Sequence, residues 1–158
     1  MANTQSMCTS FMGELMTATH NFGTAPIRAA TTADTFKAAL YLTSSTINAS
    51  TTVYTSTGEV TGTGYTPGGV TVTNATAPIA TNSSATAGVA YWTPSASITY
   101  TTVTLSTAFD AVLIYNSSQS NKAVSVHTFG SQTITAGTFT LTMPSNTTTT
   151  ALLRLSTT

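Results

Sequence analysis

The chain has 158 residues, a formal net charge of zero and only 5% charged residues, while about a quarter of its residues are threonine. An ordinary soluble domain carries about 25% charged residues, so hydroxyl groups must hydrate much of this surface. Lys, Arg, Asp, Glu, His and Cys together supply only eleven side chains, which leaves little material for catalysis or metal binding. The composition therefore favours a protein that works through its surface, and neither an enzyme nor a cofactor is expected.

The distribution of charge and apolar residues also restricts the partners. The four basic residues are scattered singly, at Arg28, Lys37, Lys122 and Arg154. Phosphate binding needs a cluster of Lys or Arg, so nucleic acid and an anionic membrane are not expected partners. No stretch reaches the ~18 apolar residues of a membrane span, and the first residues lack a secretory signal pattern. Because a net charge near zero promotes self-association, we expect a homo-oligomer, a dimer or trimer, within an assembly.

The first nine residues predict a polar, frayed N-terminal arm, and residues 10–158 predict a single domain. At the start of this domain, Ser10 can cap a helix and Gly23 can end it, which predicts a short helix over about residues 10–21. The residues that give this segment its apolar, uncharged face are Phe11, Met12, Leu15, Met16 and Ala18. Such a face needs a cover, either from the rest of the domain or from a neighbouring subunit.

Period-two alternation of apolar residues predicts that the rest of the chain forms strands. In chain order, the predicted strands centre on residues 36–42, 70–73, 98–103, 111–115, 124–127, 139–143 and 151–155. The run 111–115 is apolar without interruption, which is typical of a central strand buried on both faces. About eight short strands at this spacing predict an antiparallel β-sandwich of the jelly-roll type.

Gly, Pro, Asn and Ser separate these strands. Residues 62–69 form the densest loop signal, and residues 116–121 predict a hairpin loop. Gly130 and Gly137 predict later turns. Residues 77–96 have the least regular pattern of the chain.

No catalytic, cofactor-binding or metal-binding pattern stands out. His127 alternates with valines and is interpreted as a sheet residue, and His20 as a residue that favours the end of a helix. Tyr91 and Trp92 lie next to each other in the irregular segment. Such a pair either anchors a segment to a core or an interface, or stacks on a sugar.

Several stretches resemble the small virion structural proteins that tailed bacteriophages encode among their head genes. Residues 10–22 (SFMGELMTATHNF) are similar to the opening of that family, and residues 35–41 (TFKAALY) to one of its strands. Residues 54–69 (YTSTGEVTGTGYTPGG) match its glycine-rich signature. Residues 111–117 and 121–124 fit the family's later pattern as well.

This resemblance implies a non-enzymatic virion component on the capsid exterior, assembled in the host cytoplasm. We expect a capsid decoration or cement protein that binds across subunits of the major capsid protein and stabilises the head. The alternatives are a tail or tail-tip component and a receptor- or glycan-binding module with Trp92 exposed. The residues expected to form the docking interface are Phe11, Met12, Leu15, Met16, Tyr65, Tyr91 and Trp92.

Overall fold

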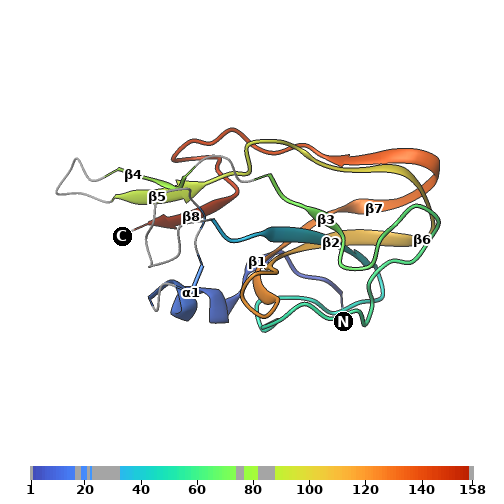
Figure 1. The fold of residues 1–158 in the computed structure, drawn as a ribbon, viewed down its shortest axis with the longest axis horizontal. Coiled ribbons are helices and arrows are strands. Elements are labelled where there is room, and N and C mark those ends of the chain that lie inside the picture. Colours follow the sequence, from blue (N-terminus) through green and yellow to red (C-terminus); the bar gives the residue numbers. More distant parts are fainter. Residues whose placement is uncertain are drawn as a thin grey trace.

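The computed structural model describes residues 2–16, 19–20, 22, 33–73, 77–81 and 88–156, with the side chains of residues 9, 12, 13 and 16 excepted. As predicted, this described chain is mainly β, and its strands form two antiparallel sheets (Figure 1). The larger sheet has the strand order β1-β7-β6-β2-β3, and the smaller has the order β4-β5-β8.

The larger sheet contains β1 (Ser6–Met7), β2 (Phe36–Leu42), β3 (Val70–Thr71), β6 (Ile98–Asn116) and β7 (Lys122–Leu141). The smaller sheet contains β4 (Ile79–Thr81), β5 (Val89–Trp92) and β8 (Leu153–Ser156). A short helix, α1 (Thr9–Met16), lies between β1 and β2. It is shorter than the helix predicted over about 10–21, because Thr19 and His20 are not helical.

The two longest strands, β6 and β7, correct the prediction of four short strands over 98–143. Each combines two of the predicted strands, and Gly130 and Gly137 lie inside β7 instead of at turns. Bulges replace those turns: the pairing register shifts repeatedly, and Thr102 and Ala136 have φ values of 55° and 45°. A bulge adds a residue to one strand and bends it without ending it, which the alternation of residue types does not reveal.

These bulges let the β6–β7 ribbon bend back on itself near the right-hand end of Figure 1. The first part of β6 thereby reaches β2, where the Tyr100 hydroxyl donates a 2.8 Å hydrogen bond to the Ala38 carbonyl. Phe109, Phe129 and Phe139 pack together inside the bend, with ring centroids 5.1–5.9 Å apart. The ribbon therefore supplies both the middle of the larger sheet and part of its cover.

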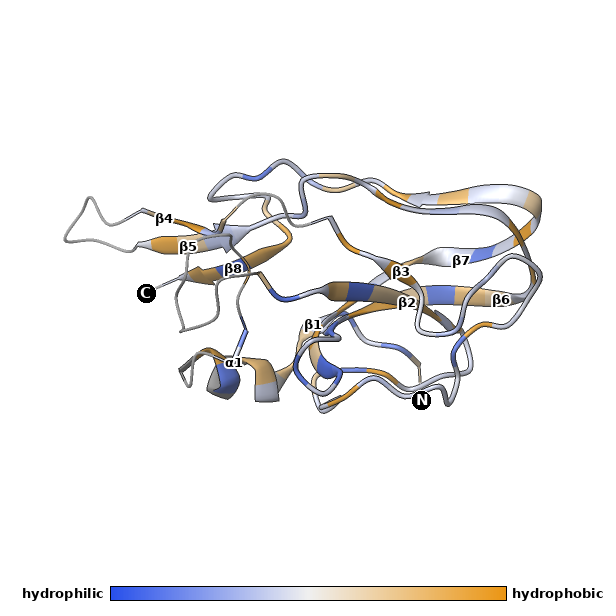
Figure 2. Ribbon diagram, viewed as in Figure 1, coloured by the Kyte–Doolittle hydropathy of each residue, from blue (hydrophilic) through white to orange (hydrophobic). Residues whose placement is uncertain are grey.

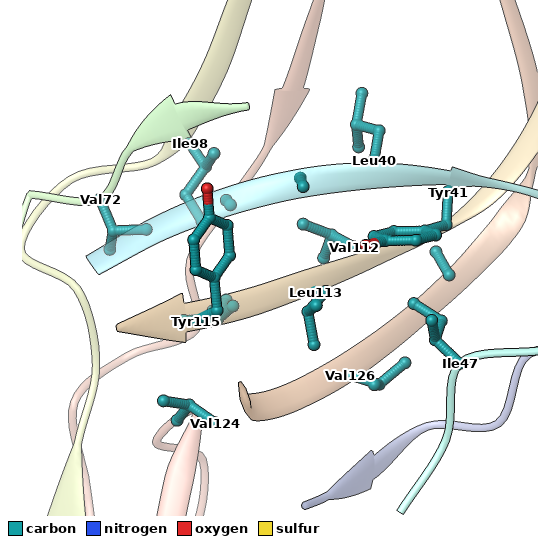
Figure 3. Close-up of a cluster of buried hydrophobic side chains, with 14 of the residues drawn as sticks. Leu40, Tyr41, Ile47, Val72, Ile98, Val112, Leu113, Tyr115, Val124 and Val126 are labelled. Carbon is teal, nitrogen blue, oxygen red and sulfur yellow. The ribbon is translucent and has the colours of Figure 1, made fainter. Parts of the chain in front are cut away.

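The larger sheet carries buried side chains on both faces. Figure 3 shows Leu40 and Ile98 on one side of the sheet and Leu113, Val126 and Ile47 on the other. The run from residue 111 to 115 is at most 3% exposed, so the prediction of a doubly buried central strand is confirmed. Figure 2 shows further apolar residues in β5 and β8 of the smaller sheet.

The smaller sheet occupies the segment that the sequence leaves irregular. Ile79 pairs with Tyr91 across β4 and β5, and Trp92 pairs with Leu153 across β5 and β8. Strands β4 and β5 have only 3 and 4 residues, too few for alternation to stand out. Pairing with the distant β8 completes this sheet.

The N-terminal arm is packed against the sheet and is not frayed. Ser6 and Met7 pair with β7, and the side-chain amide of Asn3 donates a 2.6 Å hydrogen bond to the carboxylate of Asp110. The Thr4 amide donates to the Ile47 carbonyl at 3.2 Å, and Cys8 is fully buried. Polar residues therefore hold the arm in place through specific hydrogen bonds that composition alone does not predict.

Candidate functional site

Three of the predicted docking residues lie in the core of the chain. Phe11 and Trp92 are 2% exposed and Tyr65 is 9% exposed, so these side chains pack within their own fold and offer little surface for docking. Leu15 and Tyr91 are half-buried. The side chains of Met12 and Met16 lie outside the described residues.

Trp92 anchors an aromatic cluster that joins the two sheets to the N-terminal segment. Its ring lies 4.8 Å from Phe22 and 6.2 Å from Phe36, measured between centroids. Phe11 of α1 contacts Phe22 and His20 at 5.8 and 4.8 Å. The ring of Trp92 is therefore covered, and the exposed stacking platform that a glycan-binding module requires is absent at this residue.

Beside this cluster, a chain of polar residues joins α1 to the ends of β6 and β7. Lys122 donates a 2.6 Å hydrogen bond to one oxygen of Glu14, and the other oxygen lies 2.7 Å from Nε2 of His20. Nδ1 of His20 lies 3.1 Å from the side-chain nitrogen of Asn116, which donates to Asp34 at 2.8 Å. We call these five residues the polar chain.

Burial and neighbouring charges oppose each other within the polar chain. Burial lowers the pKa of His20, although the hydrogen bond and charge of Glu14 act in the opposite direction. Burial would raise the pKa of Glu14, but the hydrogen bonds from Lys122 and His20 outweigh it and lower that pKa. At neutral pH the polar chain therefore contains an ionised Glu14 and a neutral His20.

A second polar cluster surrounds Glu59, which is 6% exposed. Its carboxylate accepts hydrogen bonds from the hydroxyls of Tyr54 and Tyr65 and from the Gly68 amide, at 2.6–2.7 Å. Burial and the Glu59 charge raise the pKa of Tyr65, so this hydroxyl stays a donor. The Tyr115 hydroxyl donates to the Gly68 carbonyl at 2.8 Å. The carboxylate thus fixes the glycine-rich loop.

An apolar pocket of about 80 Å³ lies between α1 and the smaller sheet. Its lining includes Met7, Leu15, Phe22, Pro78, Trp92 and Leu155. The pocket has room for little more than an apolar side chain.

The large apolar side chains that the fold leaves most exposed are Val53, Ile79 and Leu155, at 48%, 44% and 40%. Ile79 and Leu155 both belong to the smaller sheet, at its β4 and β8 edges. Sequence reasoning missed both, because Ile79 lies in the segment without a clear pattern and Leu155 in a stripe that predicts burial. Two of these three exposed side chains therefore lie on the smaller sheet.

The pair Ser125 and His127 has the residue types of a nucleophile and a base. The Ser125 hydroxyl lies 2.9 Å from Nε2 of His127, but Ser125 is only 1% exposed, so a substrate cannot reach it. Burial lowers the pKa of His127 to about 4. Within the described part of the chain, no group of three or more His, Cys, Asp and Glu residues could hold a metal ion.

The described helical residues do not include a segment long and apolar enough to cross a bilayer. Comparison of the chain with known proteins gives no match to a protein family, a curated protein or a solved structure.

Proposed function

We propose that this chain is a non-enzymatic structural protein of a tailed-phage virion, which decorates the capsid exterior and binds across major capsid subunits. The observation that carries this proposal is where the phage-like stretches lie. Residues 10–22, 111–117 and 121–124 supply four members of the polar chain, and residues 54–69 build the Glu59 cluster. These stretches thus contain the contacts that fix the fold, which supports a shared architecture.

The composition of the surface supports a cementing role. Contacts made by apolar groups and hydroxyls persist at high ionic strength, where exposed ion pairs are screened. A shell repeats each contact by symmetry, so a modest area for each copy adds up over the whole particle. Assembly with its own copies, as a dimer or trimer, and with the major capsid protein in the host cytoplasm belongs to the same proposal.

We also infer that the two sheets form a β-sandwich of the jelly-roll type. The support is the bent β6–β7 ribbon, whose first part contacts β2 through the bond from Tyr100 to Ala38. A jelly-roll consists of such long antiparallel ribbons wrapped over one another.

The exposed apolar side chains of the smaller sheet are the best candidates for the capsid contact. Ile79 and its neighbour Tyr91 lie on paired strands, with Leu155 at the opposite edge of the sheet. The exposed residues 61–64, 66 and 67 of the glycine-rich loop offer a second, rigidly held surface. These surfaces replace Phe11, Tyr65 and Trp92 as the proposed docking residues.

Copy number in purified phage particles tests the proposal. Quantitative mass spectrometry against the major capsid protein should give a ratio near one or a simple symmetric fraction of it. A handful of copies per particle would place the chain in the tail or at the portal vertex and overturn the cement role.

Surface variants then test the docking face. The double variant Ile79→Lys and Leu155→Lys should lower the number of copies bound per particle, whereas Val53→Lys, the matched change elsewhere on the surface, should leave it unchanged. Circular dichroism and thermal unfolding must first show that each variant is folded. Equal occupancy for all three proteins would exclude the smaller sheet as the contact.

A further inference from the structure

We propose that the polar chain is an acid-sensitive contact: protonation of His20 breaks it and releases the N-terminal segment (residues 2–16) from the larger sheet. The inference rests on hydrogen-bond roles within the fold and does not depend on a virion role. Its central element is the hydrogen-bonded series Glu14–His20–Asn116.

The orientation of the Asn116 side chain is fixed by two neighbours. Its oxygen accepts a 3.1 Å hydrogen bond from the Ser118 amide, and its nitrogen donates to the Asp34 carboxylate at 2.8 Å. A flipped side chain would bring oxygen against a carboxylate and NH₂ against an N–H group, so it would lose both bonds. The nitrogen of Asn116 therefore faces His20.

This orientation determines the tautomer of His20. Because Asn116 presents a donor, Nδ1 of His20 must accept, and the ring proton lies on Nε2, where it is donated to Glu14. Addition of a second proton would place an N–H at Nδ1, directly against the NH₂ of Asn116. The docked geometry thus accommodates neutral His20 and penalises its protonated form.

The surroundings of His20 reinforce this preference. Its side chain is fully buried, and among the described residues the charged groups that act on it are Glu14 from α1, Lys122 from β7 and Asp34 before β2. The two carboxylates favour a protonated ring, but burial and Lys122 act against it, and the net effect lowers the pKa. A released His20 regains the ordinary pKa of about 6.5, so acid favours release.

The pH range of this effect can be separated from other titrations of the segment. Release should begin as the pH falls below about 6.5, the pKa of a free histidine. The lowered pKa keeps Glu14 ionised well below that point, and burial raises the pKa of Cys8 to about 11. His127 on β7 lies beside Gln5, Ser6 and Met7 and also has a pKa lowered by burial, to about 4, so a His127 variant must separate its effect from that of His20.

Hydrogen exchange of the full chain at pH 7.5 and 5.5 tests the proposal, after correction for the intrinsic exchange rate. The reporters are the amides of Thr4 and Cys8, which donate to Ile47 and Val124, and the reference is Leu113 in the centre of β6. At pH 5.5 the reporters should lose up to about tenfold in protection relative to Leu113, as expected one pH unit below a free histidine pKa.

Two variants complete the test. His20→Gln, which does not titrate in this range, should show no such loss, whereas His127→Gln should respond as the wild-type chain does. Unchanged protection in the wild-type chain, or an equal loss in His20→Gln, would overturn the proposal.

If the N-terminal segment of the His20→Gln variant is already released at pH 7.5, nitrogen NMR of the wild-type His20 ring tests the proposal instead. A proton on Nε2 with a pKa below 6.5 is the expected result. A proton on Nδ1, or a pKa at or above that value, would contradict the mechanism.

Discussion

Glu59 accepts a 2.7 Å hydrogen bond from the hydroxyl of Tyr65, and the same hydroxyl accepts a 3.0 Å bond from the Leu40 amide. One buried oxygen thereby joins the glycine-rich loop to β2. The Glu59 carboxylate and the Leu40 amide are both buried, so water cannot replace this oxygen. Its loss would remove one hydrogen bond from each of them.

Removal of the Tyr65 hydroxyl should lower the free energy of unfolding more than removal of a less buried hydroxyl. Tyr65→Phe is expected to lower the free energy of unfolding by about 2–4 kcal/mol, since a charge-assisted bond is lost and a buried N–H is left unpaired. Tyr91→Phe, on a half-buried ring, should change it by less than about 0.5 kcal/mol. Urea denaturation followed by circular dichroism measures both, and equal effects would contradict the role given to Tyr65.

Two glycines differ in whether their position can accept a side chain. Gly69 has a φ of 71°, and a Cβ built there would lie 1.6 Å from the Ala38 carbonyl oxygen. Gly69→Ala should therefore destabilise the fold by more than about 2 kcal/mol or prevent folding. Gly130→Ala places its methyl group in open space and should be nearly neutral. Thermal unfolding of the two variants checks this, and a tolerated Gly69→Ala would show that β2 is positioned differently.

Trp92 should behave as a core residue in solution. Because its ring is 2% exposed, its fluorescence should resist quenching by acrylamide and should not respond to added polysaccharide. Trp92→Ala should lower the free energy of unfolding by about 3–5 kcal/mol, while Ile79→Ala, at an exposed site, should change it by less than about 1 kcal/mol. A polysaccharide-dependent shift in emission would revive the glycan-binding alternative.

His127 should make global stability fall in mild acid. Its folded pKa of about 4 lies below the value of about 6.5 for a free histidine, so protons bind the unfolded chain more tightly. The contribution of His127 to the free energy of unfolding is therefore largely present above pH 6.5 and is lost as the pH falls towards 4. Between pH 7.5 and 5 this loss amounts to about 2 kcal/mol. Denaturant titrations of His127→Gln should show a loss smaller by that amount, whereas an identical pH profile would exclude His127 as the source.

The sequence predicts those strands whose side chains alternate between two well-defined environments. Strand β2 and the doubly buried part of β6 were predictable because apolar residues recur on a surface that is largely covered. The loop at residues 116–121 was also predictable, because its Asn and Ser residues favour turns. Local alternation and turn chemistry were sufficient for these elements.

Other features depend on contacts that a local pattern does not contain. The long strands persist through Thr102 and Ala136, two residues with positive φ that no composition rule marks. Sequence alternation also does not identify which face is covered, so Phe11 and Trp92 were expected at an interface although both lie in the core. The polar chain joins residues that are up to 108 positions apart, which only the folded chain brings together.

The pairing of Ser6 and Met7 with Ser125 and Val126 has a consequence for folding. A ribosome makes the first strand of the larger sheet long before it makes the strand that accepts it. Until β7 has emerged, Cys8 and Phe11 have no sheet to cover them, and β2 lacks its partner β6. Such non-local pairing is slow to form, so these apolar residues stay exposed through most of synthesis. With only 5% charged residues to keep it soluble, the nascent chain is especially dependent on protection from aggregation.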